Sequence, residues 1–254
     1  MKKIIIALVA LMGVANANEA SIVWDLSFNG DSYTVRNANG ENYNSLTLKL
    51  NGATIENGVC TSSSANRVTM EDSSPTLRMM DNFSYVIQGG LNNVDVYMGI
   101  LFGLGEGTKY SIMVRKEESG LLGFYGLDYV MSNKTGNFAP KFGEMGTYIV
   151  TVDNHGKTHS QESSAALTLY YNGVEIASAS LSSNHCTTQP LDTFAAGGQN
   201  YHEGRATDFS FTNIQLYSGL LSQEQIAQLS VPEPTTATLG AFALVSLLMR
   251  RRRR

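Results

Sequence analysis

The stretch that decides the fold lies between residues 147 and 176, where Thr147-Tyr148-Ile149-Val150-Thr151-Val152 precedes Leu167-Thr168-Leu169-Tyr170-Tyr171. Both runs are rich in β-branched and aromatic side chains, which favour strands. The second run is followed by Asn172-Gly173 and then by Val174-Glu175-Ile176. Asn-Gly between two apolar runs is typical of a two-residue hairpin, because a type I′ turn needs positive φ at both central residues. An antiparallel hairpin centred on 172–173 is therefore predicted.

Outward from this hairpin, the chain shows further short runs of strand-forming residues separated by turn residues. Strands are predicted at Phe83 to Ile87, Val94 to Leu101 and Tyr110 to Arg115. The intervening turns are expected at Gly89-Gly90, Asn92-Asn93, Gly105 to Gly107 and Asn154 to Gly156. There is no repeat of 20 to 50 residues and no internal linker. The pattern predicts one all-β domain over residues 18–230, a β-sandwich.

One helix is predicted near the end of this domain. Ser222 is suited to cap it, and Gln225 three residues later completes a capping box. Leu221 before the cap can pack against Ile226, and Ile226 and Leu229 share one face. We expect this face to pack on the sheet.

The strand pair at 148–153 and 167–175 resembles the paired strands of laminin-G-like, concanavalin A-like domains of the lectin and glucanase type. Residues 209–217, followed by 221–229, resemble the closing strand and short helix of those domains. The resemblance implies a jelly roll of two antiparallel sheets. One departure lies before the closing strand, where Thr207-Asp208-Phe209 replaces the usual small acidic pair.

Residues 1–17 have the pattern of a secretory signal peptide. Lys2 and Lys3 provide a positive start, and an apolar run extends from Ile4 to Val14. Ala15-Asn16-Ala17 then supplies the small-x-small pattern that signal peptidase recognises. Cleavage by signal peptidase is predicted after Ala17.

The other end combines three elements: Pro232-Glu233-Pro234, an uncharged stretch from Thr235 to Met249, and five arginines at 250–254. A helix over the uncharged stretch would be roughly 22 Å long, at about 1.5 Å per residue, against a hydrocarbon core of about 30 Å. Snorkelling arginines and local thinning of the bilayer can close that gap. The arginines are expected to stay cytoplasmic, which places the body of the protein on the far side of the membrane. An ordinary tail anchor is the alternative.

Residues 231–254 resemble the PEP-CTERM sorting signal of Gram-negative bacteria that make extracellular polymers. The resemblance implies that Pro232, Glu233 and Pro234 are recognised by an exosortase-type sorting enzyme and are not catalytic themselves. It also implies an inner-membrane anchor, at least until processing, and a final location in the periplasm or at the cell surface.

The charge between the two ends is strongly acidic. Seven of the 18 basic residues lie at positions 2, 3 and 250–254, which leaves 11 basic residues against 22 acidic ones. Nucleic acid is therefore excluded as a partner, since its phosphates require a basic surface. No cofactor is expected, and calcium is the one alternative because it prefers oxygen ligands.

Cys60 and Cys186 are the two cysteines of the chain. Export to an oxidising compartment favours a single disulfide between them. Such a bond would close a loop of more than 100 residues and contribute about 4–5 kcal/mol through chain entropy. Two buried free thiols are the alternative.

Catalytic and metal-binding patterns were not found. His155 and His159 have the i, i+4 spacing of a zinc site, but they lie in a predicted turn, where that spacing does not converge. The Glu-x-Asp-x-x-Glu run of sandwich-fold glucanases is absent, and Glu71-Asp72 and Glu117-Glu118 would each face opposite sides of a strand. We therefore expect no catalytic residues, no metal site and no enzymatic activity.

Sugar binding would use aromatic faces and hydrogen-bonding loops. Trp24 is expected in the core, and Tyr125, Tyr129, Tyr201 and His202 are candidates without an assigned site. The sequence leads to a non-catalytic module that binds glycan or matrix, with a polysaccharide as candidate partner. A divergent glycoside hydrolase of the same fold and a purely structural surface protein are the alternatives.

Overall fold

The structure is a computed structural model that describes residues 20–63, 66–74, 82–93, 98–104, 111–115, 121–125, 141–153, 165–181, 193–197 and 207–230. These residues form two antiparallel sheets and one short helix. The large sheet contains β1 (Ser21–Asn29), β2 (Ser32–Arg36), β4 (Thr54–Glu56), β5 (Val59–Ser62), β7 (Asn82–Asn93), β11 (Met145–Asp153), β12 (Ala165–Tyr171), β13 (Val174–Leu181) and β15 (Asp208–Ser218). The small sheet contains β3 (Leu46–Lys49), β6 (Val68–Asp72), β8 (Met98–Leu104), β9 (Ser111–Arg115), β10 (Leu121–Tyr125) and β14 (Thr193–Ala196).

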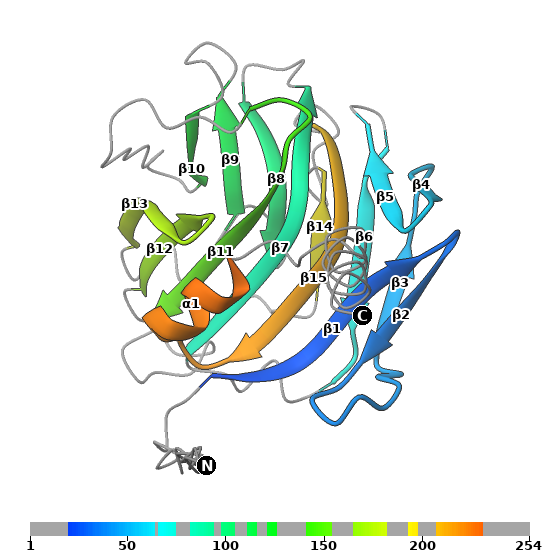
Figure 1. The fold of residues 1–254 in the computed structure, drawn as a ribbon, viewed down its shortest axis with the longest axis horizontal. Coiled ribbons are helices and arrows are strands. Elements are labelled where there is room, and N and C mark those ends of the chain that lie inside the picture. Colours follow the sequence, from blue (N-terminus) through cyan, green and yellow to red (C-terminus); the bar gives the residue numbers. More distant parts are fainter. Residues whose placement is uncertain are drawn as a thin grey trace, which may run out of the picture.

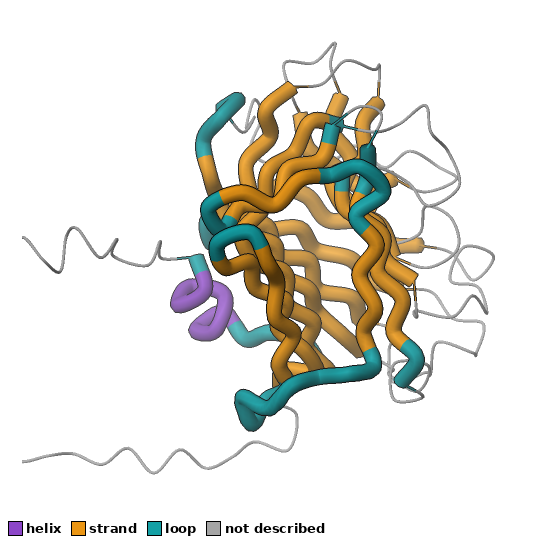
Figure 2. The backbone as a smooth tube through the Cα atoms, turned by 90° about the vertical axis from the view of Figure 1, so that its right-hand side faces the viewer, coloured by secondary structure: helices purple, strands orange, loops and turns teal. Residues whose placement is uncertain are grey.

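The strand order interleaves segments that are far apart in the sequence. In the large sheet the order is β13-β12-β11-β7-β15-β1-β2, while β5 pairs with both β15 and β4. In the small sheet the order is β10-β9-β8-β14-β6-β3. Figure 1 shows β15 between β7 and β1, although β15 is the last of the described strands in the sequence. Figure 2 shows the two sheets as facing layers. The predicted β-sandwich is therefore confirmed.

The core lies between the two sheets and is held largely by aromatic side chains. Trp24 of β1 is fully buried and meets Phe194 of β14 edge-to-face, with 5.4 Å between ring centroids. Phe28 and Phe211 make a similar contact at 5.4 Å. Such pairs add about 0.5–1.5 kcal/mol to the energy of burial. The assignment of Trp24 to the core is confirmed.

The Asn-Gly hairpin is also confirmed. Asn172 has φ 48° and Gly173 has φ 81°, as a type I′ turn requires, and β12 and β13 pair on either side of it. The predicted turn at Gly89-Gly90 is wrong, because both residues lie inside β7. A Cβ on Gly89 would approach Cζ of Phe209 to 2.6 Å. These glycines permit close packing between strands, which the sequence alone does not distinguish from a turn.

The predicted helix is confirmed as α1 (Gln223–Leu229). The Gln225 backbone N–H donates to Oγ of Ser222 at 3.2 Å, and the Ser222 backbone N–H donates to Oε1 of Gln225 at 2.9 Å, which completes the capping box. Ile226 is 1% exposed and lies in an apolar cluster on the outer face of the large sheet. The other buried members are Ala20, Val86, Ile149, Tyr170, Tyr217 and Leu221. Figures 1 and 2 show α1 outside the sandwich, against that sheet.

The predicted sorting elements lie outside the described residues. This applies to the leader with Ala15 and Ala17, and to the tail with Pro232, Glu233 and Pro234. Among the residues that the structure does describe, no helix is long and apolar enough to cross a membrane.

Candidate ligand-binding surface

The outer face of the large sheet has an apolar part under α1 and a polar part beside it. The polar part is built by β1 and β15, whose alternation turns Trp24, Leu26, Ile214 and Leu216 inward. The intervening side chains point outward. We call five of these the Asp25 network: Asp25, Ser27, Asn213, Gln215 and Tyr217.

A β-bulge on β15 gives the network its register. The pairing with β7 shifts between Phe211 and Asn213, so Thr212 is an extra residue in the strand. Phe211 and Ile214, three positions apart, consequently both face the core. After the bulge, Asn213 pairs with Ser27 and Gln215 pairs with Asp25. The bulge therefore brings two amide side chains next to the carboxylate of Asp25.

The Asp25 carboxylate accepts hydrogen bonds from three partly buried neutral donors. Oδ1 accepts from Nδ2 of Asn213 at 2.5 Å and from Oγ of Ser27 at 2.9 Å, and Oδ2 accepts from Nε2 of Gln215 at 3.0 Å. The orientation of the Asn213 amide is fixed, because a flip would place its oxygen against the carboxylate. Among the described atoms, Oδ1 of Asn213 is buried and has no donor. The network is rigid, and one of its acceptors is unused.

Tyr217 extends the network toward α1. Its hydroxyl donates to Oε1 of Gln215 at 3.0 Å, and the residue is 6% exposed. Burial, together with the smaller effect of the negative charge of Asp25, raises the pKa of Tyr217 to about 12. The hydroxyl therefore stays protonated at neutral pH and acts as a donor within the network.

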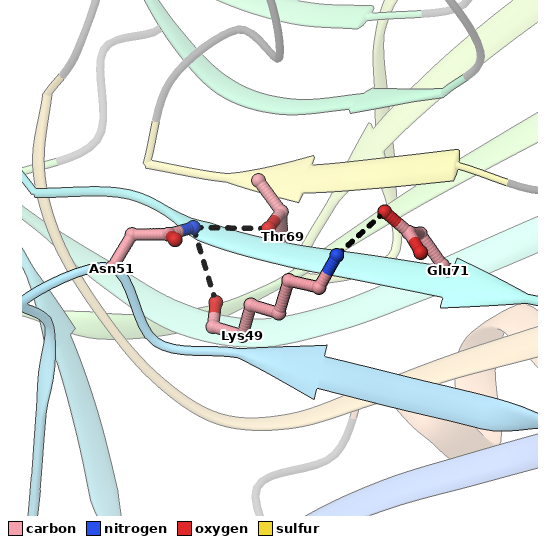
Figure 3. Close-up of polar contacts among 4 residues, drawn as sticks. All are labelled: Lys49, Asn51, Thr69 and Glu71. Carbon is pink, nitrogen blue, oxygen red and sulfur yellow. Dashed lines mark hydrogen bonds and ion pairs between the residues drawn. The ribbon is translucent and has the colours of Figure 1, made fainter.

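The outer face of the small sheet carries a second polar group, the Lys49 patch, formed by Lys49, Asn51, Thr69 and Glu71 (Figure 3). Nζ of Lys49 lies 3.0 Å from Oε1 of Glu71, and the two side chains are 53% and 58% exposed. Nδ2 of Asn51 donates to Oγ1 of Thr69 at 2.9 Å and to the Lys49 carbonyl at 3.3 Å. This patch pairs opposite charges in solvent, whereas the Asp25 network does not.

The adjacent residues Glu71 and Asp72 face opposite sides of β6, as predicted. Glu71 is exposed, while Asp72 is 2% exposed and faces inward. The Tyr43 hydroxyl donates to Oδ2 of Asp72 at 2.9 Å, and the Ser74 backbone N–H donates to Oδ1 at 2.8 Å. Burial raises the pKa of Tyr43 to about 12. The two carboxylates cannot act together, so they form no catalytic pair.

Cys60 is fully buried on β5 and has no disulfide partner among the described residues, and burial raises the pKa of its thiol to about 12. Its expected disulfide partner Cys186 lies outside the described residues, so the Cys60–Cys186 bond stays a prediction. His155, His159, Tyr129, Tyr201 and His202 also lie outside the described residues. Within the described ranges, no three His, Cys, Asp or Glu side chains gather as metal ligands.

Known proteins resemble this chain in structure and not in sequence. No family model and no curated protein matches the sequence. Among solved structures, the fold is similar to Trypanosoma rangeli sialidase, with 13% identity and a TM-score of 0.60 over 85% of this chain and 33% of that chain. This protein thus spans a third of the sialidase's length. It is also similar to Domain 4 of AbnA, a GH43 extracellular arabinanase from Geobacillus stearothermophilus, in complex with arabinotriose.

The match to the arabinanase domain covers 84% of this chain and 99% of that one, with 16% identity and a TM-score of 0.55. A third similar structure is the ligand-binding domain of botulinum neurotoxin serotype D in complex with N-acetylneuraminic acid. That match has 10% identity and a TM-score of 0.55 over 85% of this chain and 52% of that chain. At such identities the comparisons establish the fold, a β-sandwich that occurs in carbohydrate-active and carbohydrate-binding proteins.

The comparisons correct one expectation from the sequence. The absence of a glucanase-type acidic run led us to expect no enzymatic activity. Two of the similar structures are a sialidase and a domain of an arabinanase, which are enzymes. The absence of one family's catalytic run therefore does not separate this chain from enzymes that contain the same fold.

Proposed function

We propose that this chain is an exported glycan-binding protein with a jelly-roll, concanavalin A-like sandwich. The observation that carries the proposal is the similarity to Domain 4 of the arabinanase. The similarity extends over nearly all of that domain, and that domain is in complex with arabinotriose. The neurotoxin domain, which holds N-acetylneuraminic acid, supports the same class of ligand.

The surface chemistry of the sandwich supports this proposal. Sugars are bound by polar groups that are already fixed in place, because ordering free side chains costs about 0.5–1.5 kcal/mol each. The outer face of β1 and β15 has amide, carboxylate and hydroxyl groups held by hydrogen bonds to one another. Such groups match the donor and acceptor pattern of sugar hydroxyls.

A glycan array tests the proposal. The full chain is applied to one array, and a denatured sample of the same protein is applied to a second. We expect saturable binding to a subset of bacterial or host polysaccharides that the denatured sample does not bind. Absence of binding to every glycan would overturn the proposal and favour a purely structural surface protein.

A second candidate function is hydrolysis of glycosides, which the sialidase and arabinanase similarities favour. The same preparation is incubated with arabinan, β-glucan and sialosides, and release of reducing sugar or sialic acid is measured. Release above that of a heat-inactivated control would establish this second function. No release from any of the three would remove it for these substrate classes.

The proposal includes export and sorting through the two ends of the chain. The leader at 1–17 would be removed by signal peptidase, and the tail at 231–254 would be read by an exosortase-type enzyme through Pro232, Glu233 and Pro234. The five terminal arginines next to the uncharged stretch support this orientation. Cell fractionation and N-terminal sequencing test it: a protein in the periplasm or on the surface that begins at Asn18 is expected. An uncut cytosolic chain would overturn this part.

A further inference from the structure

We infer that the Asp25 network is the glycan subsite of this protein and that it selects uncharged sugars over acidic ones. This inference rests on the proposed function and gives it a location and a ligand class. It follows from three features of the network: its free acceptor position, its carboxylate without an ion pair and its place on the sheet.

The first feature is the arrangement of acceptors. Asp25 Oδ2 accepts from Gln215 alone among the described residues, so it has lone pairs left for a ligand hydroxyl. Oδ1 of Asn213 also has no donor among the described atoms, but it is enclosed by the protein, so the acceptor that a ligand can use is Oδ2 of Asp25. The network can therefore accept hydrogen bonds from a polyhydroxylated ligand.

The second feature is the charge of Asp25. Its three hydrogen-bond donors among the described residues, Ser27, Asn213 and Gln215, are all neutral. Arg36 lies opposite Asp25 on β2, yet its Nη1 donates to the Gly40 carbonyl at 2.6 Å. No ion pair of Asp25 occurs among the described residues. No cation of the described residues therefore contacts the carboxylate directly.

The surroundings reinforce this charge. The described ranges contain eleven acidic residues and five basic ones. An acidic sugar, such as a sialic acid, would bring a second carboxylate toward Asp25 and would be repelled in a partly buried setting. Neutral sugars experience no such repulsion, and their hydroxyls are good donors to a carboxylate.

The third feature is the position of the network. It lies beside α1 on the outer face of the large sheet, between the β-bulge at Ile22/Trp24 on β1 and the bulge at Phe211/Asn213 on β15. Bulges are over-represented next to functional sites, where they re-aim side chains. Here the bulge on β15 directs Asn213 and Gln215 outward to the carboxylate.

Matched variants of the full chain test the inference on an array that carries arabinotriose and paired neutral and sialylated oligosaccharides with the same core. Asp25→Asn removes the charge with little change of shape. Ser27→Ala removes one hydroxyl and keeps the charge, so it also serves if Asp25→Asn folds poorly. Glu71→Gln on the opposite face is the control, and circular dichroism verifies the fold of each variant.

The wild-type protein is expected to bind neutral members of the pairs at least tenfold more tightly than their sialylated counterparts. Asp25→Asn should weaken neutral binding about tenfold and reduce the discrimination against sialylated members. Ser27→Ala should weaken neutral binding several-fold and keep the discrimination, while Glu71→Gln should remain within twofold of wild type.

Three outcomes would overturn the inference, and they are distinguishable. Normal glycan binding by Asp25→Asn and Ser27→Ala would place the site elsewhere, with the proposed function intact. A preference for sialylated members would contradict the charge argument alone. If the wild-type protein itself binds no glycan, the inference is overturned together with the proposed function.

Discussion

The two outer faces of the sandwich both carry polar side chains on neighbouring antiparallel strands, but they use them differently. On the large sheet, Asp25 is partly buried and bonded to neutral amide and hydroxyl donors. On the small sheet, Lys49 and Glu71 form an ion pair whose side chains are more than half exposed. From this difference we expect the partly buried contacts of Asp25 to contribute more to stability than the exposed ion pair of Lys49 and Glu71.

The largest expected difference between the faces is in stability. Asp25→Ala removes the acceptor of three hydrogen bonds and leaves the partly buried amide donor of Gln215 without its acceptor, while Asn213 keeps the Leu26 carbonyl and Ser27 Oγ. We expect the free energy of unfolding to fall by about 2–3 kcal/mol, because unpaired donors retain their desolvation cost. Urea denaturation of both proteins measures this value. A loss below about 0.5 kcal/mol would show that water replaces the carboxylate at no cost.

An intermediate effect is expected in alkaline solution. The raised pKa of Tyr217 means that the fold favours the neutral phenol. The corresponding stability is complete below the unfolded pKa of about 10 and is lost as the pH rises through about 12. We therefore expect the free energy of unfolding to fall less between pH 8 and pH 12 for Tyr217→Phe than for wild type, as measured by denaturation. Equal losses in the two proteins would contradict the assignment.

The smallest effect is expected on the small sheet. Glu71→Gln breaks the exposed ion pair with Lys49, for which about 0.2–1 kcal/mol is typical. Added salt should reduce the difference further, since it screens exposed charges. Thermal unfolding at low and at high salt measures both values. A loss as large as that of Asp25→Ala would remove the distinction between the two faces.

The sequence predicted the parts of the fold that depend on neighbouring residues. The hairpin at Asn172-Gly173 and the capping box of Ser222 and Gln225 both have local causes, and both are confirmed. The turn expected at Gly89-Gly90 is wrong because the reason for these glycines is the ring of Phe209, 120 positions away in the chain. Glycine alone does not reveal which of its two uses applies.

The candidate site was missed for a similar reason. Asp25 and Ser27 alternate with Trp24, Leu26 and Phe28, so their outward direction is readable from the sequence. Their partners on β15 are not readable, since Gln215 lies 190 positions from Asp25. The bulge at Thr212 also shifts the register by one residue, so the side chains after it lie on the face opposite to the one that simple alternation predicts.

The central place of β15 has a consequence for the biogenesis of the protein. β15 pairs with β7 on one side and with β1 on the other, and the first pair of residues, Ser21 and Ser218, closes almost the whole described chain. Until β15 has emerged from the ribosome, β1 and β7 each keep an open edge. Long-range pairing of this kind is also slow. An emerging chain thus cannot complete its sandwich early. If the chain is exported as proposed, this delay favours passage through a translocon in the unfolded state, because β1 and β7 have not yet been joined by β15.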